Sequence, residues 1–141
     1  MMTIITLLLS LTFLFLSGMH LYWLSGGTWG IDRVIPTKTQ VDKPSSYPPP
    51  LATLIVALGL ASFGLAYFLK LPFFDWSLPT GLQFVYWFIP AIFFLRAIGE
   101  FNYVGFFKRI KDTAFAKADS RVFSPLCLGI AILGGMVFLF L

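Results

Sequence analysis

The chain has 141 residues, of which 58% are hydrophobic and only 11% are charged. A soluble domain carries charge on about a quarter of its residues, so this composition excludes an ordinary water-soluble domain and predicts a membrane protein. The net charge of +4 lies mostly in two segments between apolar runs, which favours contact with lipid headgroups over nucleic acid, and the single cysteine, Cys127, excludes an internal disulfide or a CxxC redox or zinc site.

The first apolar run, about residues 3–25, contains no charged residue and one histidine, His20. At 1.5 Å per residue it is long enough to span a bilayer. No Lys or Arg precedes the apolar stretch and no small-x-small cleavage pattern follows it, so we expect a retained helix rather than a signal peptide. Residues 26–50 hold so many glycines and prolines that we predict a long loop there.

The next two apolar runs predict two more spans, at about residues 51–70 and 80–99. In the first of them Ala57, Ala61 and Gly64 form a stripe of small residues, which is typical of a face that packs against another helix. In the second, the spacing of Thr80 and Gln83 predicts a capping box at the helix start. Pro90 lies inside that helix, where it removes one backbone hydrogen bond.

Residues 100–123 carry most of the remaining charge, alternating with apolar residues. The pattern in residues 106–118 predicts an amphipathic helix on the membrane surface. Ser124 and Pro125 then form an N-cap and first-turn pair that opens a last span over residues 124–141. The expected fold is therefore a single all-α domain, an integral membrane four-helix bundle with an amphipathic interfacial helix before the last span.

Basic residues distinguish the two sides of the membrane. With four spans, Lys70 is the only basic residue on the side of the termini, and the other basic residues fall in or beside residues 26–50 and 100–123. Positive charge marks the cytoplasmic side, so we expect an inner-membrane protein with both termini outside and both large loops in the cytoplasm. The central thirds of the spans hold no charged residue or histidine, which argues against an ion-coupled transporter.

Three ionisable residues lie at a similar depth near the cytoplasmic ends of the first and third spans: His20, Arg96 and Glu100. Arg96 and Glu100 are four positions apart, so both are expected on one helix face. We predict a site in which Arg96 holds an anionic headgroup while His20 and Glu100 exchange protons as the catalytic candidates. The alternative is an intrahelical Arg96–Glu100 ion pair and a histidine bonded to a carbonyl.

Further candidate ligand-binding residues are Trp29, Tyr103 and Thr113, although Trp29 also fits the aromatic belt found at headgroup depth. Neither a metal nor a cofactor is expected, because the chain shows no spacing typical of either.

The sequence also resembles an uncharacterised family, a domain of unknown function found in small bacterial membrane proteins with four helices. The resemblance rests on His20, Leu21, Tyr22, Trp23, Gly27, Trp29, residues 34–37, Arg96, Gly99, Glu100, Phe101, Tyr103, residues 105–108, Thr113, Phe115, Asp119 and residues 124–127. It covers most of the chain. It implies a membrane location and a shared fold, and it transfers no activity.

Three classes of function stay open. The first is a structural or accessory protein that binds another membrane protein or itself, suggested by the small-residue stripe. The second is a small interfacial enzyme that acts on a lipid or isoprenoid through His20, Arg96 and Glu100. The third is a passive carrier of a lipid or small molecule. In each case membrane lipids are expected partners and nucleic acid is not.

Overall fold

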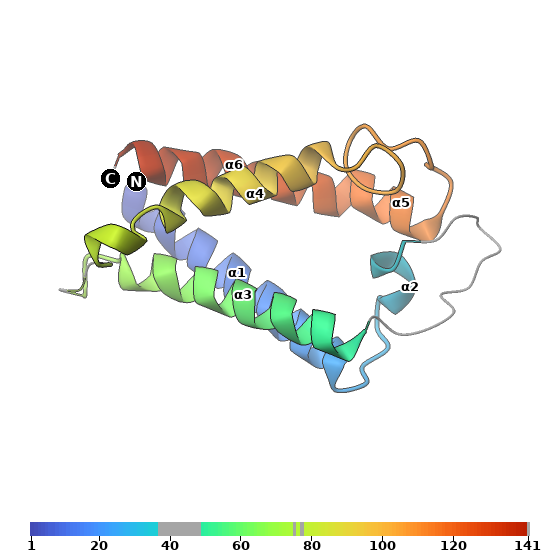
Figure 1. The fold of residues 1–141 in the computed structure, drawn as a ribbon, viewed down its shortest axis with the longest axis horizontal. Helices are drawn as coiled ribbons and strands as arrows, with labels where there is room; N and C mark the ends of the chain where they lie inside the picture. Colours follow the sequence, from blue (N-terminus) through green and yellow to red (C-terminus); the bar gives the residue numbers. More distant parts are fainter. Residues whose placement is uncertain (37–48, 75, 77, 141) are drawn as a thin grey trace.

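The structure is a computed structural model that describes residues 1–36, 49–74, 76 and 78–140. Within these residues all regular secondary structure is helical (Figure 1). The elements are α1 (Met2–Leu24), α2 (Ile31–Val34), α3 (Pro50–Leu69), the 3-10 turn Thr80–Leu82, α4 (Val85–Ile98), α5 (Ala114–Ala118), the π-turn Asp119–Phe123 and α6 (Ser124–Leu139). The described chain forms four helical segments long and apolar enough to cross a membrane, which confirms the predicted fold class.

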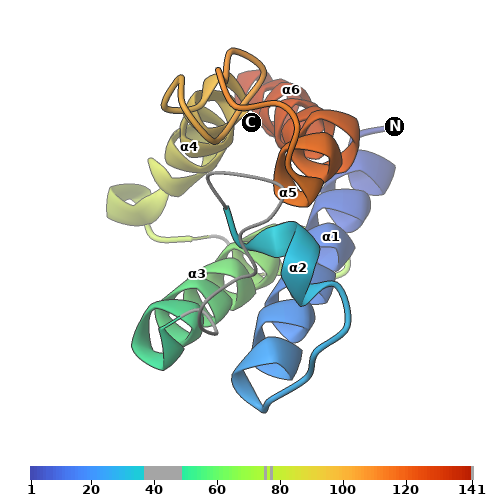
Figure 2. The ribbon, with the colours of Figure 1, turned by 90° about the vertical axis from the view of Figure 1, so that its right-hand side faces the viewer.

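The four long helices are arranged as two pairs. Helix α1 packs along α3 and α4 packs along α6, and the view from the end shows the two pairs as two layers (Figure 2). Both chain termini lie at one end of the bundle, and α2 and α5 lie at the other (Figure 1). The buried core lies in the halves of the helices nearest the termini: Leu9, Phe13, Leu60, Tyr67, Tyr86, Ile89, Ile130 and Val137. The opposite end is therefore free to hold polar groups.

The small residues of α3 pack against α1, as predicted. The Ser17 hydroxyl donates to the carbonyl of Ala57 at 2.7 Å, and the Ser10 hydroxyl donates to the carbonyl of Gly64 at 2.9 Å. A Cβ at Gly64 would lie 2.9 Å from Leu14 Cγ, so the two helices approach too closely for a larger residue there. Ala57 and Gly64 are buried, and Ala61 is partly exposed.

The third span begins at Thr80, as expected, but the predicted capping box is not formed. Pro79, not Thr80, occupies the N-cap position and makes no side-chain hydrogen bond there, and the backbone N–H of Gln83 donates to the Thr80 carbonyl in a 3-10 turn. Pro90 lies inside α4 and faces α6, where a Cβ at Gly134 would lie 3.2 Å from Pro90 Cβ. Close packing against a small residue accommodates the proline.

The last span differs most from the prediction. It begins at Ala114 rather than Ser124, because α5, the π-turn and α6 form one continuous helical segment, Ala114–Leu139. The predicted surface helix over residues 106–118 is wrong for residues 106–112, which are not helical. Pro125 is tolerated inside the segment because the π-turn already interrupts the regular hydrogen-bond ladder just before it. Ser124 is therefore not an N-cap.

Candidate functional site

The site begins where α4 ends. Gly99 has φ +83° and Gly105 has φ +91°, values that favour glycine, and Gly99 stops the helix after Ile98. The two glycines lie backbone to backbone: a Cβ at Gly99 would overlap the Val104 carbonyl, and one at Gly105 would overlap the Ile98 carbonyl. The chain after α4 is thus folded tightly onto the helix end, which brings residues 105–108 beside the π-turn.

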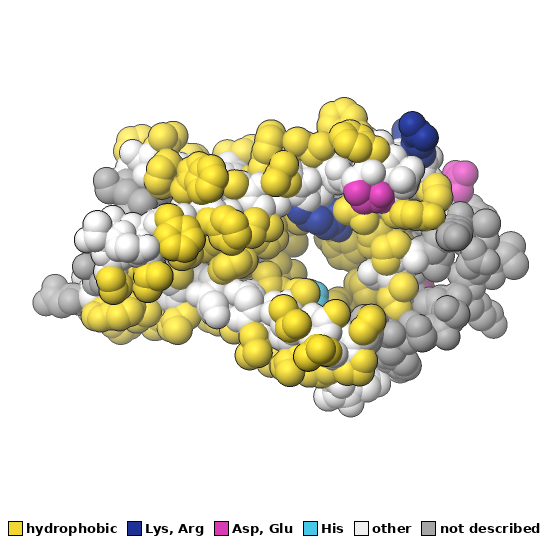
Figure 3. Space-filling model, viewed as in Figure 1, with side chains coloured by type: hydrophobic (Ala, Val, Ile, Leu, Met, Phe, Trp, Pro, Cys, Tyr) yellow, Lys and Arg dark blue, Asp and Glu magenta, His cyan; other side chains and the backbone are white. Residues whose placement is uncertain are grey.

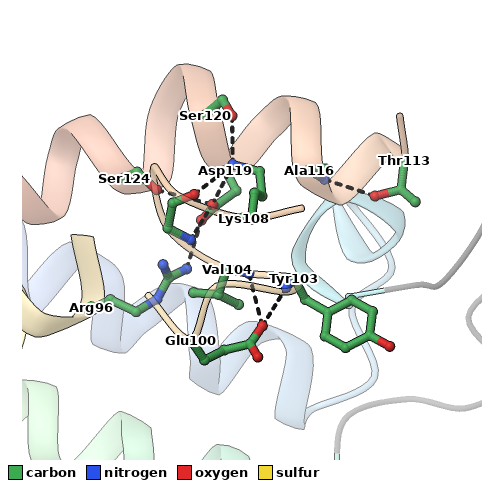
Figure 4. Close-up of polar contacts among 11 residues, drawn as sticks. Arg96, Glu100, Tyr103, Val104, Lys108, Thr113, Ala116, Asp119, Ser120 and Ser124 are labelled. Carbon is green, nitrogen blue, oxygen red and sulfur yellow. Dashed lines mark hydrogen bonds and ion pairs between the residues drawn. The ribbon is translucent and has the colours of Figure 1, made fainter. Parts of the chain in front are cut away.

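Asp119 is the centre of the polar contacts at this end of the bundle. Its carboxylate is fully buried, and Oδ1 accepts a hydrogen bond from Arg96 Nη2 at 2.9 Å. Oδ2 accepts from the Gly105 N–H at 2.9 Å and from Lys108 Nζ and Ser124 Oγ at 3.0 Å each (Figure 4). We call these five residues the Asp119 cluster. It joins α4, the loop after it and the last helical segment.

The π-turn Asp119–Phe123 explains why the Ser124 hydroxyl reaches the Asp119 carboxylate along with the other donors. A π-turn bonds residues five apart, so Asp119 and Ser124 lie on the same side of the helix, whereas a regular α-helix would separate them. The Ser124 hydroxyl, predicted as a helix cap, instead holds the carboxylate. Turns of this kind occur frequently at functional sites.

The Asp119 cluster carries an excess positive charge. Lys108 is 2% exposed and uses its three donors on Asp119 Oδ2, the Gly105 carbonyl at 2.9 Å and Ser120 Oγ at 2.6 Å. Arg96 and Lys108 are two cations against one anion. Arg96 Nη1 is buried and has no hydrogen-bond partner among the described residues. The guanidinium charge itself is paired with Asp119 and the Arg96 side chain is 32% exposed, so Nη1 is an unsatisfied donor beside a paired charge.

Arg96 and Glu100 do not share a helix face, so the predicted intrahelical ion pair is wrong. The helix ends at Ile98, and Glu100 belongs to the loop. Its side chain is exposed, and Oε1 accepts the backbone N–H groups of Tyr103 and Val104 (Figure 4). Arg96 binds Asp119 instead. Glu100 therefore shapes the loop, and its role as a proton carrier stays a prediction.

His20 is held by its own helix. Its Nδ1 lies 2.7 Å from the Leu16 carbonyl oxygen, and its ring meets the Trp23 ring edge-on at 5.3 Å. A carbonyl only accepts, so Nδ1 carries a hydrogen and donates it to Leu16. Among the described residues Nε2 has no hydrogen-bond partner. The carbonyl contact is the one expected, and it leaves the other nitrogen available.

A hollow opens between the two helix pairs, towards the end that holds α2 and α5 (Figure 3). A basic side chain lies on its upper edge in this view and the chain's single histidine, His20, lies on its lower edge. Hydrophobic side chains surround much of the opening. The hollow exists because the pairs touch each other chiefly through α1 and α6 and pack most tightly nearer the termini.

The other three candidates have different surroundings. Thr113 is buried and its Oγ1 accepts the Ala116 N–H at 3.0 Å, so it caps α5; its role as a ligand-binding residue stays a prediction. Trp29 is 72% exposed. The Tyr103 ring points away from the Asp119 cluster (Figure 4). In the described parts of the chain, no three His, Cys, Asp or Glu side chains are placed to hold a metal ion.

Comparison with known families decides what the chain belongs to. The sequence model of the family described as "Protein of unknown function (DUF3995)" matches residues 13–134. The chain belongs to the DUF3995 family. The matched region of this DUF3995 member includes all five residues of the Asp119 cluster and His20. Curated proteins and solved structures gave no match.

Sequence reasoning from hydropathy missed the two most buried charges, Lys108 and Asp119. It assigned Lys108 to an amphipathic surface helix over residues 106–118 and left Asp119 in the cytoplasmic connection just after that helix. The family resemblance was the signal that could have found them. Arg96, Lys108, Asp119 and Ser124 all belong to the segments on which it rested, and the structure brings these segments into contact.

Proposed function

We propose that this DUF3995 membrane protein binds the anionic headgroup of an amphiphile in the hollow between its helix pairs. The observation that carries the proposal is Arg96, whose Nη2 is fixed by Asp119 while its buried Nη1 has no partner among the described residues. A guanidinium that is held on one side by Asp119 and remains 32% exposed suits an oxyanion, since Arg binds phosphate and carboxylate through several directed hydrogen bonds. The apolar surroundings of the hollow suit acyl chains.

A lipid-modifying enzyme and a passive lipid carrier would both need to bind a headgroup, so the proposed role is compatible with either class of function. An accessory role, in which the chain binds another membrane protein, has less support than headgroup binding. The small residues that suggested this role pack against α1 of the same chain. Headgroup binding is therefore the function that the geometry favours.

Replacing Arg96 by glutamine is expected to weaken binding of dioleoyl phosphatidic acid by about tenfold or more, because charge-assisted hydrogen bonds are lost. Equilibrium binding to the purified protein in detergent micelles measures the change. Arg121→Gln is the matched control, since Arg121 is exposed on the π-turn and should leave binding unchanged. Circular dichroism checks that each variant is folded. Equal affinity of the wild type and the folded Arg96→Gln variant would refute the proposal.

We also propose that the termini lie outside the inner membrane and that the end with α2 and α5 faces the cytoplasm. Supporting this, most basic residues of the described chain gather at that end: Arg33, Arg96, Lys108, Arg109, Lys111, Lys117 and Arg121. Lys70 follows α3 at the end of the termini, where partial burial lowers its pKa. Lys38 and Lys43 lie outside the described residues.

For this orientation, alkaline phosphatase fused to the C-terminus is expected to be active, because that enzyme matures only outside the cytoplasm, and a fused green fluorescent protein is expected to be dark. Fusions placed in the loop between α4 and α5 should give the reverse pattern. A fluorescent C-terminal fusion with inactive phosphatase would show that the orientation is inverted.

A further inference from the structure

We infer that the loop after α4, residues 99–113, lies in the membrane interface and presents Phe101, Phe106 and Phe107 to the lipid. Most of this loop stands on the outer side of the α4–α6 pair, away from α1 and α3 (Figures 1 and 2). Its outer surface is therefore separate from the hollow, and the inference holds whatever ligand the hollow takes. The partner is an anionic leaflet of the bilayer that surrounds the four spans.

The length of α4 sets the depth of this loop. The span Thr80–Ile98 has 19 residues, about 28 Å at 1.5 Å per residue, and the hydrocarbon core of a bilayer is about 30 Å thick. The chain therefore leaves α4 at the edge of the hydrocarbon core. It then turns back along the helix, where the Phe106 N–H donates to the Ala97 carbonyl at 2.8 Å. This bond holds the loop at the level of the last helical turn.

Three phenylalanines form the outer surface of the loop. Phe101 is 55% exposed, Phe106 42% and Phe107 64%, and the rings of Phe101 and Phe107 lie 6.4 Å apart. Hydrophobic side chains gather over this loop at the upper edge of the molecule (Figure 3). Phe101 has φ +69°, a conformation that a bulky residue rarely adopts. A strained backbone that carries an exposed ring indicates a use for that ring outside the fold.

The backbone of the loop is suited to this depth. Acyl chains offer no hydrogen bonds, so irregular backbone beside them must find its partners within the protein. The carboxylates of Glu100 and Asp119 and nearby carbonyls accept many of the N–H groups of the loop. The bonded donors are Tyr103, Val104, Gly105, Phe106, Arg109 and Ile110. The Asp119 cluster therefore fastens to the last span a loop that can lie beside lipid.

Two exposed cations adjoin the aromatic surface. Arg109 and Lys111 follow Phe107 in the loop, and Figure 3 shows a basic side chain beside the hydrophobic ones. An anionic leaflet attracts Lys and Arg that lie close to its surface. Rings at the acyl boundary with cations among the headgroups are typical of interfacial segments. Docking of a water-soluble protein on the same rings is the alternative that the experiment must separate.

The experiment measures the depth of spin labels in the full-length chain, reconstituted into bilayers of equal parts dioleoyl phosphatidylcholine and dioleoyl phosphatidylglycerol. Cys127→Ala removes the native thiol, and one new cysteine at a time carries the label. Phe107→Cys labels the loop, Leu95→Cys labels an exposed site on α4, and Asp32→Cys labels an exposed site on α2 at the same end of the bundle.

Collisions of each label with oxygen, which concentrates in lipid, are compared with collisions with a water-soluble nickel chelate. We expect the oxygen-to-nickel ratio at position 107 to be several-fold higher than at position 32 and to approach the ratio at position 95. Phe106→Cys carries the label if the Phe107 variant does not reconstitute, and it should give the same order.

The two cations are tested in the same labelled protein. Replacing phosphatidylglycerol by further phosphatidylcholine should lower the ratio at position 107, because the cations lose their attraction to the surface. Arg109→Gln combined with Lys111→Gln should produce the same fall in the anionic bilayer. Arg33→Gln changes an exposed cation on α2 and is the matched control, which should leave the ratio unchanged.

Each outcome bears on a named part of the inference. A ratio at position 107 as low as at position 32 would overturn it, because the rings would then face water, as docking of a soluble protein requires. A high ratio that responds neither to lipid charge nor to the glutamine variants would overturn the headgroup contacts of Arg109 and Lys111 and support insertion of the rings alone. Binding in the hollow is tested separately by Arg96→Gln.

Discussion

Asp119→Asn is expected to destabilise the folded protein by about 3–5 kcal/mol, the usual cost of leaving buried charge without its partner. Asparagine has nearly the same shape, but it is neutral and cannot accept from Lys108 and Ser124 as the carboxylate does. Lys108 would then be a buried cation without its ion-pair partner, and Arg96, whose side chain is 32% exposed, would lose its ion pair as well. The free energy of unfolding in detergent micelles measures the loss.

Two comparisons make this prediction specific. Lys108→Met removes one of the two cations and leaves Asp119 paired with Arg96, so it should cost less than Asp119→Asn, about 1–3 kcal/mol. Asp32→Asn alters an exposed carboxylate in α2 and should change stability by no more than about 0.5 kcal/mol. If Lys108→Met proved as damaging as Asp119→Asn, the excess positive charge of the cluster would be contradicted.

Gly105→Ala is expected to cost about 3 kcal/mol or more, from backbone strain together with a lost charge-assisted hydrogen bond. Gly105 has φ +91°, where an alanine is strained, and its new methyl group would overlap the Ile98 carbonyl. The loop would have to move away from α4, which would withdraw the Gly105 N–H from Asp119. Thermal unfolding of the purified variant measures this effect.

Gly129→Ala provides the matched control for that variant. Gly129 lies inside α6 and a Cβ there meets nothing within 4 Å, so alanine should be neutral or should stabilise the helix by about 0.5–1 kcal/mol. The two glycine variants should therefore shift the unfolding temperature in opposite directions, or only Gly105→Ala should lower it. Similar unfolding temperatures for both variants would show that the loop after α4 does not depend on this glycine.

Together these variants separate stability from ligand binding. Asp119, Lys108 and Gly105 hold Arg96 in place, so their loss should affect folding and headgroup binding alike. His20 is partly exposed beside the hollow and takes part in one hydrogen bond, with its own helix.

Local sequence patterns were enough to predict the four membrane-spanning helices. Apolar runs of membrane-spanning length predict the four spans, and the small residues Ala57 and Gly64 predict a helix-packing face, because both features depend on neighbours within one helix. The same local reasoning predicted a surface helix before Ser124. A sequence in which charged and apolar residues alternate is the same whether the charged side chains face water or pair with a buried carboxylate.

Composition and hydropathy were sufficient to predict a membrane protein and its four spans, because they record how each helix meets lipid. Which charged residues contact each other depends on the fold. Lys108 and Asp119 become partners through a glycine loop and a π-turn that place residues 11 apart in the chain at 3.0 Å. The same folding turns Arg96 from Glu100 to Asp119 and leaves one guanidinium nitrogen without a partner in the described chain. Hydropathy carries no information about such contacts, because they depend on the path of the backbone between helices.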